Sequence, residues 1–369
     1  MFYYLSNLSN KYELLSFFRL FDSILFRSTA SMITALLVSI IFGRHIINIL
    51  YKLKIRDVVR DYQGISANDK KGTPTMGGII IILSISLSLL IWSNLGSVFV
   101  ITTFFSLIWF GVLGAVDDYY KIKFKDSDKG LSQFKKFLFQ IIAAVVIAYV
   151  FTLSPYSPFS PEEVTKLYLP FAKSSFGIEL GLFYPIFLVL VIVSIANAVN
   201  FADGMDGLAI VPSITSAAVF GLLAYIVGNY NFSSYLLYKF VPGTGEMLIV
   251  AASLIGSGMG FLWYNSYPAS VFMGDTGSMA IGGVLAVLVI SVKQEFLFAI
   301  SGGIFVAEAF SVLVQEKIGI NMLGRRIFYR APLHDTFKYM GSSETKIVQR
   351  LWILSIILSL VALLSIKIR

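Results

Sequence analysis

Three segments of the chain place acidic side chains directly beside long apolar runs. Asp117 and Asp118 end one run, residues 197–207 join two others, and Asp275 opens a fourth within residues 272–278. Carboxylate oxygens are the ligands that Mg²⁺ prefers, and the sequence offers no cysteine and only two histidines for a softer metal. Lysines beside these carboxylates would suit a pyrophosphate. Together these residue types predict Mg²⁺-dependent phosphoryl transfer, in which a metal bridges phosphates and the protein neutralises charge.

The adjacent carboxylates Asp117 and Asp118 fall at the C-terminal end of an expected helix. The helix dipole disfavours negative charge there, and the two side chains also repel each other. A metal ion or lysines would relieve this repulsion, and Lys121, Lys123 and Lys125 follow at once. A solvated helix end is the less favoured alternative for this segment taken alone.

Residues 197–207 contain two Asn, two Asp and two Gly at the boundary between two apolar runs. Asp206 could cap the following helix, and the glycines could form a tight turn. Polar groups at membrane depth are costly unless they are buried in protein or line a cavity. The density of polar residues therefore favours a functional loop over a plain turn.

Other features are ambiguous when taken singly. Asp275 is favourable at a helix N-terminus through capping and the helix dipole, and Asn265 lies at the end of the preceding apolar run. Residues 70–78 could bind an anion on the free N–H groups of a helix start, or could form an ordinary helix start after two lysines. His334 is one of two histidines, and a lone histidine is more often structural than catalytic.

The apolar residues are grouped in blocks of roughly twenty, each long enough to cross about 30 Å of hydrocarbon as a helix. Mean hydropathy is +0.79, 57% of the residues are hydrophobic and 14% are charged, which is far from the composition of a soluble domain. The sequence predicts an all-α integral membrane protein of about ten transmembrane helices. They are expected near residues 28–50, 76–93, 98–117, 134–154, 183–200, 208–227, 247–264, 273–292, 296–316 and 350–366.

The positive-inside rule gives the orientation of these spans. Lysines and arginines concentrate in three loops on one side of the membrane, at residues 51–75, 118–136 and 317–350. That side is predicted to be cytoplasmic and to carry the active site, with both termini outside. The bias also explains the net charge of +8, so no nucleic-acid partner is expected. Little chain remains for loops, so residues 1–369 are predicted to form a single polytopic domain in the lipid bilayer.

The motifs, taken in order, resemble those of the phospho-N-acetylmuramoyl-pentapeptide transferase family (translocase I of peptidoglycan synthesis). The strings GTPTMGG at 72–78 and VFMGDTGS at 271–278 are very specific, and the resemblance covers nearly the whole chain. It implies that phospho-MurNAc-pentapeptide is moved from UDP-MurNAc-pentapeptide to undecaprenyl phosphate in a bacterial inner (cytoplasmic) membrane, giving lipid I and UMP. Further matching positions are Lys70, Lys71, Asp117, Asp118, Tyr119, Gly130, Leu131, Lys136, residues 197–208, residues 265–277, Gln315 and residues 325–334.

Carried over position by position, the resemblance makes Asp275 a Mg²⁺ ligand and Asp117 and Asp118 the acidic pair at the reacting phosphates. Asp117 is the candidate base on the lipid phosphate, although a monoester with a second pKa near 6 needs little more than positioning. One-step attack by the lipid phosphate is expected, and a two-step route through an aspartyl-phosphate is the alternative. The resemblance implies substrate-binding roles for Asn265, for Lys70, Lys121, Lys125 and Lys136 at phosphates, for Asn200, Asp203 and Asp206 around the nucleotide and sugar, and for Gln315 near the uracil.

The chain departs from the family after Ala331-Pro332. The family usually shows three consecutive histidines followed by Phe-Glu, whereas residues 334–338 here read His-Asp-Thr-Phe-Lys. His334 is retained as a candidate catalytic residue, and an essential role for the second and third histidines is in doubt. Residues 316–324 also depart, which could alter a loop that closes over the substrate.

Two other functions compete with this interpretation. A polyprenyl-phosphate GlcNAc-1-phosphate transferase of the same superfamily would share most of the motifs. A transporter would also have many spans and intramembrane polar residues, but its polar groups should lie near the bilayer midplane on paired half-helices. The sequence leaves open the third residue of the peptide, the isoprenoid length and whether the protein is a homodimer.

Overall fold

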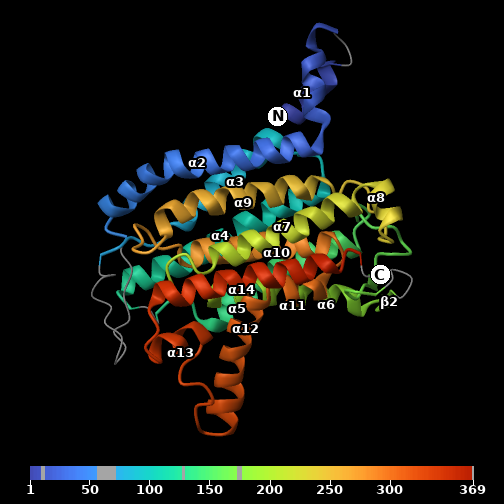
Figure 1. The fold of residues 1–369 in the computed structure, drawn as a ribbon. Helices are drawn as coiled ribbons and strands as arrows, with labels where there is room; N and C mark the ends of the chain where they lie inside the picture. Colours follow the sequence, from blue (N-terminus) through green and yellow to red (C-terminus); the bar gives the residue numbers. More distant parts are fainter. Residues whose placement is uncertain (10–12, 56–71, 127–128, 173–176, 368–369) are drawn as a thin grey trace.

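Long apolar helices make up most of the chain. The computed structural model describes residues 1–9, 13–55, 72–126, 129–172 and 177–367. Most helices lie side by side along one direction, while α1, η1 and α12 project from the bundle (Figure 1). The elements are α1 (Phe2–Ser9), η1 (Glu13–Asp22), α2 (Ile24–Lys52), α3 (Gly78–Trp92), α4 (Val98–Phe124), α5 (Gln133–Thr152), β1 (Lys166–Leu167), β2 (Ile178–Glu179), α6 (Phe183–Ala202), α7 (Ile210–Val227), α8 (Tyr230–Tyr235), α9 (Glu246–Asn265), α10 (Gly274–Ser291), η4 (Glu295–Leu297), α11 (Phe298–Ser301), α12 (Gly303–Leu313), η5 (Val314–Met322), α13 (Leu333–Tyr339) and α14 (Glu344–Leu364).

The all-α membrane class predicted from the sequence is confirmed. Eight of the described helices are long and apolar enough to cross a membrane, and the number is nine if the bent pair over residues 295–322 counts as one span. The helix α3 is apolar but has only 15 residues. The total of ten spans and the placement of both termini outside stay predictions.

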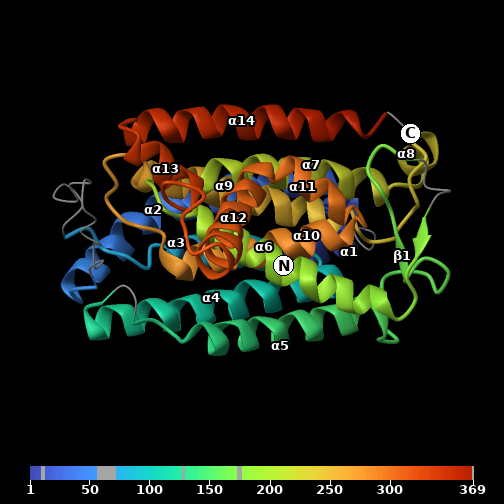
Figure 2. The ribbon, with the colours of Figure 1, turned by 90° about the horizontal axis from the view of Figure 1, so that it is seen from below.

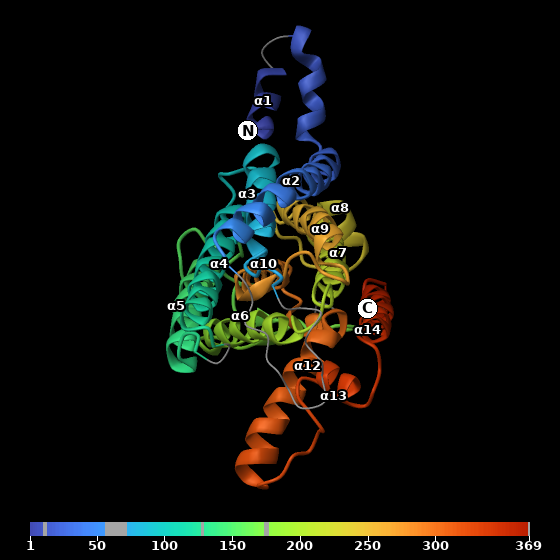
Figure 3. The same cartoon turned by 90° about the vertical axis from the view of Figure 1, so that its left-hand side faces the viewer.

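The span predicted over residues 296–316 is wrong as one continuous helix. The chain bends by 90° between the helices that end at Ser301 and begin at Gly303. Two adjacent glycines weaken the helix there, and a Cβ at Gly302 would lie 2.6 Å from the ring of Phe298. As a result α12 and η5 leave the bundle and project from it (Figures 1 and 3).

The helix α10 forms the centre of the bundle, with other helices around it when the bundle is seen end-on (Figure 3). Its residues from Thr276 to Ser291 are all buried. Small residues allow this, because a Cβ at Gly282 would lie 2.7 Å from the backbone of Ala196 on α6. Close backbone approach of this kind is how helices pack in lipid, where the hydrophobic effect between helices is absent. The rigid centre fixes the position of Asp275 in the first turn of α10.

One end of the bundle holds the ends of α2, α4, α6 and α9 and the starts of α5, α10 and α14 (Figure 1). The basic loops recognised in the sequence connect these elements, and this end is called the basic end below. The two-stranded β1–β2 hairpin lies at the opposite end. There the ammonium group of Lys293 donates to the backbone oxygens of Glu163 and Lys166, and burial lowers the pKa of this lysine to about 8.

A buried ion pair ties the first long helix to α9 at the end opposite the basic end. Arg27 donates to both carboxylate oxygens of Glu246, at 3.0 and 2.6 Å, and to the backbone oxygen of Trp92. Glu246 also accepts from the backbone N–H of Asn94. Both charged side chains are almost fully buried, so each depends on the other for compensation.

Replacing Glu246 with alanine is expected to destabilise the protein by about 3–5 kcal/mol, because the change leaves Arg27 as an uncompensated buried charge. Thermal unfolding in detergent measures the loss. The double variant Arg27→Met, Glu246→Leu should unfold at a higher temperature than Glu246→Ala. An unchanged unfolding temperature in Glu246→Ala would contradict this role of the pair.

Candidate active site

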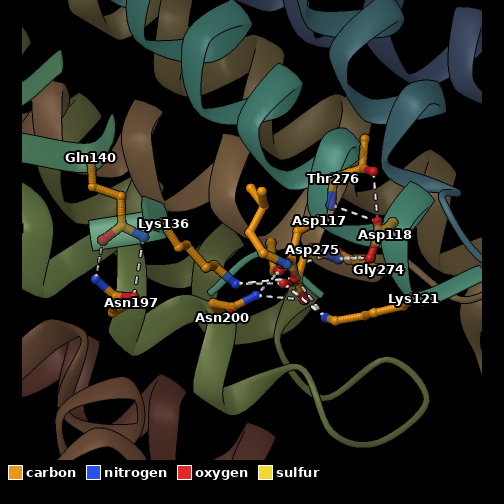
Figure 4. Close-up of polar contacts among 12 residues, drawn as sticks. Asp117, Asp118, Lys121, Lys136, Gln140, Asn197, Asn200, Gly274, Asp275 and Thr276 are labelled. Carbon is orange, nitrogen blue, oxygen red and sulfur yellow. Dashed lines mark hydrogen bonds and ion pairs between the residues drawn. The ribbon is translucent and has the colours of Figure 1, made fainter. Parts of the chain in front are cut away.

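Four helix ends meet at the basic end and bring charged and amide side chains together (Figure 4). Asp117 lies near the C-terminus of α4, Lys136 in the first turn of α5, Asn200 in the last turn of α6 and Asp275 in the first turn of α10. These residues are far apart in the sequence, and the helix packing alone makes them neighbours.

Two carboxylates share two lysine ammonium groups at this point. The Nζ of Lys121 lies 2.8 Å from Oδ2 of Asp117 and 3.1 Å from Oδ2 of Asp275. The Nζ of Lys136 lies 2.5 Å from Oδ2 of Asp275 and 3.5 Å from Oδ2 of Asp117. Asn200 donates to the other oxygen, Oδ1 of Asp275, at 3.0 Å. These five residues are called the carboxylate–lysine cluster, and the lysines offset the repulsion between two partly desolvated carboxylates.

Asp118 has a different environment from its neighbour Asp117. It is 4% exposed and accepts hydrogen bonds from the backbone N–H groups of Asp275 and Thr276, at 3.1 and 2.9 Å, and from the Thr276 hydroxyl. Asp118 therefore caps the N-terminus of α10 from another helix, where the dipole favours negative charge. Successive residues on a helix point about 100° apart, so the two adjacent carboxylates face different partners.

The two glycine-rich strings of the sequence form one unit in the structure. Phe272 donates its N–H to the backbone oxygen of Pro74, and Gly77 and Gly78 donate to Phe272 and Met273 at 2.9 Å. The N–H groups of Gly77 and Gly78 are therefore already bonded, and the idea that they are free to bind an anion is wrong. A Cβ at Gly78 would collide with the backbone of α10 at Gly277.

The variant Gly78→Ala is expected to lower the unfolding temperature and the activity together, because α3 and α10 must separate and Asp275 moves with α10. Overpacking of this kind costs roughly 1–3 kcal/mol. Thermal unfolding and turnover check the effect, with Gly96→Ala as a control, since the nearest atom to a Cβ there is 3.4 Å away. Wild-type stability and turnover in Gly78→Ala would show that the close approach is not needed.

An amide pair that the sequence analysis did not identify fixes α5 against α6. Gln140 donates to Oδ1 of Asn197 at 3.2 Å, and Asn197 donates back to Oε1 of Gln140 at 2.7 Å (Figure 4). Gln140 lies one turn beyond Lys136, and Asn197 lies one turn before Asn200. The pair therefore orients both residues toward Asp275. The signal in the sequence for this amide pair was a polar residue, Gln140, one turn from a site lysine.

The loops after α6 and α9 bind each other beside the cluster. Asp206 accepts from the N–H of Ala269, and Asn265 accepts from the N–H of Gly207 and donates to the oxygen of Val271. The helix α7 begins at Ile210 with Ala209 as its N-cap, so the alternative that Asp206 caps it is wrong. Asp206 and Asn265 thus hold the shape of these loops.

His334 is buried beside the Asp203–Gly204 turn. It is 2% exposed, and its Nδ1 lies 3.2 Å from Oε2 of Glu308 without hydrogen-bond alignment. Its backbone N–H donates to the same oxygen. The imidazole also packs so closely on Gly204 that a Cβ there would collide with Nε2. Glu308 was not identified from the sequence, although a carboxylate inside an apolar run is a signal for it.

The remaining predicted residues that the structure describes lie apart from the cluster. Gln315 accepts from the N–H groups of Ile327 and Phe328, so it shapes the loop after η5. Lys125 is exposed at the C-cap of α4, and within the described ranges no contact joins it to the carboxylates. Asp203 is the half-buried C-cap of α6, and Lys70 falls outside the described residues. Thr336, at the position of the third family histidine, accepts from the N–H of Arg330.

The donor set of the cluster fits a Mg²⁺ ion that also binds substrate phosphates. Among the described residues no group of three or more acidic or histidine side chains forms a self-sufficient metal site. Mg²⁺ commonly takes only one or two protein carboxylates and completes its shell with water and phosphate oxygens. The Oδ2 atoms of Asp117 and Asp275, which converge on the same ammonium groups, meet that requirement.

The fold and the site define a multi-pass membrane protein with a carboxylate–lysine centre suited to phosphoryl transfer. Residues 98–293 match the model of glycosyl transferase family 4, and residues 70–82 match signature 1 of the phospho-N-acetylmuramoyl-pentapeptide-transferases. The chain belongs to the phospho-N-acetylmuramoyl-pentapeptide-transferase family, which confirms the resemblance seen in the motifs.

Curated proteins of that name are similar to the chain over its whole length. One from Citrifermentans bemidjiense is 44% identical over 370 residues and covers 100% of both chains. One from Geobacter sp. strain M21 is 45% identical over 353 residues, 95% of this chain and 96% of its own. One from Desulfovibrio desulfuricans is 44% identical over 372 residues, 100% of both.

Proposed function

We propose that the protein transfers phospho-MurNAc-pentapeptide from UDP-MurNAc-pentapeptide to undecaprenyl phosphate, forming lipid I and UMP for peptidoglycan synthesis. The observation that carries this proposal is the carboxylate–lysine cluster, in a chain that belongs to this family. The site faces the cytoplasm of a bacterial inner membrane, where a soluble nucleotide donor and a membrane-embedded acceptor can meet. A homodimer is compatible with this arrangement.

The reaction exchanges one phosphoric anhydride bond for another. An oxygen of the lipid phosphate bonds to the sugar-linked phosphorus of the donor, and the bond from that phosphorus to the oxygen of UMP breaks, with its electron pair leaving on UMP. Phosphoryl transfer of this kind depends on positioning and charge neutralisation more than on covalent help from the protein. The lipid phosphate is largely ionised at neutral pH, so Asp117 mainly positions the attacking oxygen and accepts a residual proton.

The two lysines and the Asn200 amide of the cluster have separate roles in the reaction. Lys121 and Lys136 reach both carboxylates, and in the presence of substrate they are placed to bind the phosphate oxygens on which charge develops. Asn200 holds Oδ1 of Asp275 and so fixes the direction of Oδ2. Asp118 fixes the start of α10 and acts as a positioning residue.

Asp275 is the residue that would hold Mg²⁺, with Asp117 beside it. When bound, the ion supplies Lewis-acid neutralisation of the phosphate oxygens. His334, held between Glu308 and Gly204, supports the Asp203 turn beside the nucleotide.

Release of UMP by the purified protein tests the proposal. The protein in detergent is given a polyprenyl phosphate, Mg²⁺ and either UDP-MurNAc-pentapeptide or UDP-GlcNAc. Turnover of the first donor alone supports the proposal. Turnover of UDP-GlcNAc alone would move the protein to the GlcNAc-1-phosphate branch, and flux through liposomes without any turnover would favour a transporter.

A further inference from the structure

The segment after α6, residues 203–208, is called the 203–208 loop below, and it is held from three sides. One side is His334, whose imidazole packs on Gly204, and a second is the end of α9 with the segment that follows it. The third side is α14, which runs along one edge of the bundle with α13 beside its first turns (Figure 2). The contact with α14 joins Asp206 to Glu344, 138 residues away in the chain, so it depends entirely on the packing of the helices.

One face of α14 contacts the 203–208 loop. Glu344 and Trp352 are eight residues apart, about two helical turns, so they lie on the same face of the helix. The indole N–H of Trp352 donates to the backbone oxygen of Gly207 at 3.1 Å. The apolar side chains between these two polar contacts pack in one buried cluster, which includes Met205 and Leu208 of the loop and Ile347, Val348 and Leu351 of α14.

Glu344 forms the polar end of this face at the basic end of the bundle. Its Oε1 accepts a hydrogen bond from the backbone N–H of Asp206 at 3.2 Å, and its Oε2 accepts from Nζ of Lys338 on α13 at 3.1 Å. The side chain of Glu344 is only 9% exposed, and it lies in the first turn of α14, where the helix dipole favours a carboxylate. One carboxylate therefore joins the start of α14, the 203–208 loop and α13.

Lys338 belongs to the segment in which the chain departs from its family. It lies one turn after His334 on α13, so the two side chains are on the same face of this helix. His334 contacts the 203–208 loop directly at Gly204, and Lys338 reaches the loop through Glu344. The family usually has glutamate at position 338, which would place two carboxylates side by side and make them repel each other. In this chain the lysine forms an ion pair at that point instead.

We infer that Glu344 is a positioning residue for the uridine nucleotide of the donor and that Lys338 fixes its carboxylate. Glu344 holds the backbone of the loop that carries Asp203 and Asp206, the carboxylates that the proposed function puts around the nucleotide and sugar. It therefore acts on the donor through the 203–208 loop. This inference rests on the proposed function and adds two residues outside the carboxylate–lysine cluster that set the affinity for the donor.

The variant Glu344→Ala tests the inference through binding alone. The backbone N–H of Asp206 loses its hydrogen bond to a charged acceptor, so the dissociation constant for UMP, measured by calorimetry without the lipid, should rise about tenfold. Glu344→Gln keeps an acceptor oxygen at the same place and should stay within about threefold of the wild type. Glu162→Ala is the control, because Glu162 is an exposed glutamate next to the β1–β2 hairpin at the opposite end. A wild-type dissociation constant in folded Glu344→Ala would overturn the inference.

Steady-state kinetics separate positioning of the nucleotide from a general loss of stability. In Glu344→Ala the KM for UDP-MurNAc-pentapeptide should rise, while kcat and the KM for the polyprenyl phosphate stay within about twofold of the wild type. A fall in kcat and in unfolding temperature with an unchanged KM for the donor would overturn the inference. A wild-type protein that neither binds UMP nor releases it from the donor would instead reject the proposed function, so the two failures are distinguishable.

A double-variant cycle tests the charge of Lys338. Lys338→Glu puts a second carboxylate against Glu344, and the repulsion should raise the dissociation constant for UMP about tenfold. Adding Glu344→Gln removes the repulsion and should bring the constant back to within about threefold of the wild type. Lys346→Glu is the matched control, because Lys346 is an exposed lysine on α14 and the change in charge is the same. An effect of Lys338→Glu no larger than that of Lys346→Glu, or no recovery in the double variant, would overturn the inference.

Discussion

Replacement of Asp275 by asparagine is expected to reduce turnover about a thousandfold or more while the protein stays folded. Asp275 contacts Lys121, Lys136 and Asn200 at once, so its charge organises the whole cluster. Asparagine keeps the shape but removes the charge that would hold Mg²⁺ and pair with both lysines. Losing a preorganised charge at a reacting phosphate costs at least the factor of about 10²–10³ known for one such donor.

The test of Asp275→Asn is the initial rate of UMP release across a range of Mg²⁺ concentrations. Asp126→Asn is the control, because the Asp126 carboxylate pairs with the exposed Lys129. Thermal unfolding shows whether each variant is folded. A folded Asp275→Asn protein that retains a tenth or more of the wild-type rate would exclude Asp275 from the reaction centre.

The second large effect is expected at Lys136. In Lys136→Ala, Asp275 loses its closest cation, at 2.5 Å, and the substrate phosphates lose one of two half-buried ammonium groups. A loss of about a hundredfold in kcat/KM follows from the removal of one such charge. The adjacent Lys135→Ala is a matched control, since Lys135 is an exposed lysine on the same helix turn.

A comparison of kcat and KM separates binding from chemistry in Lys136→Ala. If Lys136 binds the phosphates equally well in the ground state and in the transition state, KM for the donor rises and kcat is retained. The contact with two carboxylates predicts that kcat falls as well. Equal rates for Lys136→Ala and Lys135→Ala would remove Lys136 from the site.

The positions of the helices could be predicted from the sequence because a transmembrane span depends only on the apolar residues within its own segment. Blocks of apolar residues near 98–117 and 183–200 correspond to α4 and α6 within a few residues at the start of each helix. The exception is the 90° bend at Gly302, where two glycines interrupt an apolar block that hydropathy averages into one helix. Hydropathy reports whether a segment is suited to burial in lipid. It does not report the direction in which the helix runs.

The composition of the site was also predictable, but its internal pairing was not. The sequence treats Asp117 and Asp118 as one acidic pair, whereas helix geometry directs Asp117 to the lysines and Asp118 to the start of α10. Gln140 and Glu308 were missed because their roles depend on partners at Asn197 and His334, far away in the chain. Such pairings arise from tertiary packing, which one sequence alone does not specify.

The measurement that tests the central claim most directly is identification of the lipid product. The purified protein, undecaprenyl phosphate and UDP-MurNAc-pentapeptide are incubated with Mg²⁺, and lipid and UMP are quantified by mass spectrometry. The account predicts one diphosphate-linked lipid carrying MurNAc-pentapeptide for each UMP, and neither product without the metal. A folded wild-type protein that forms no such lipid would contradict it.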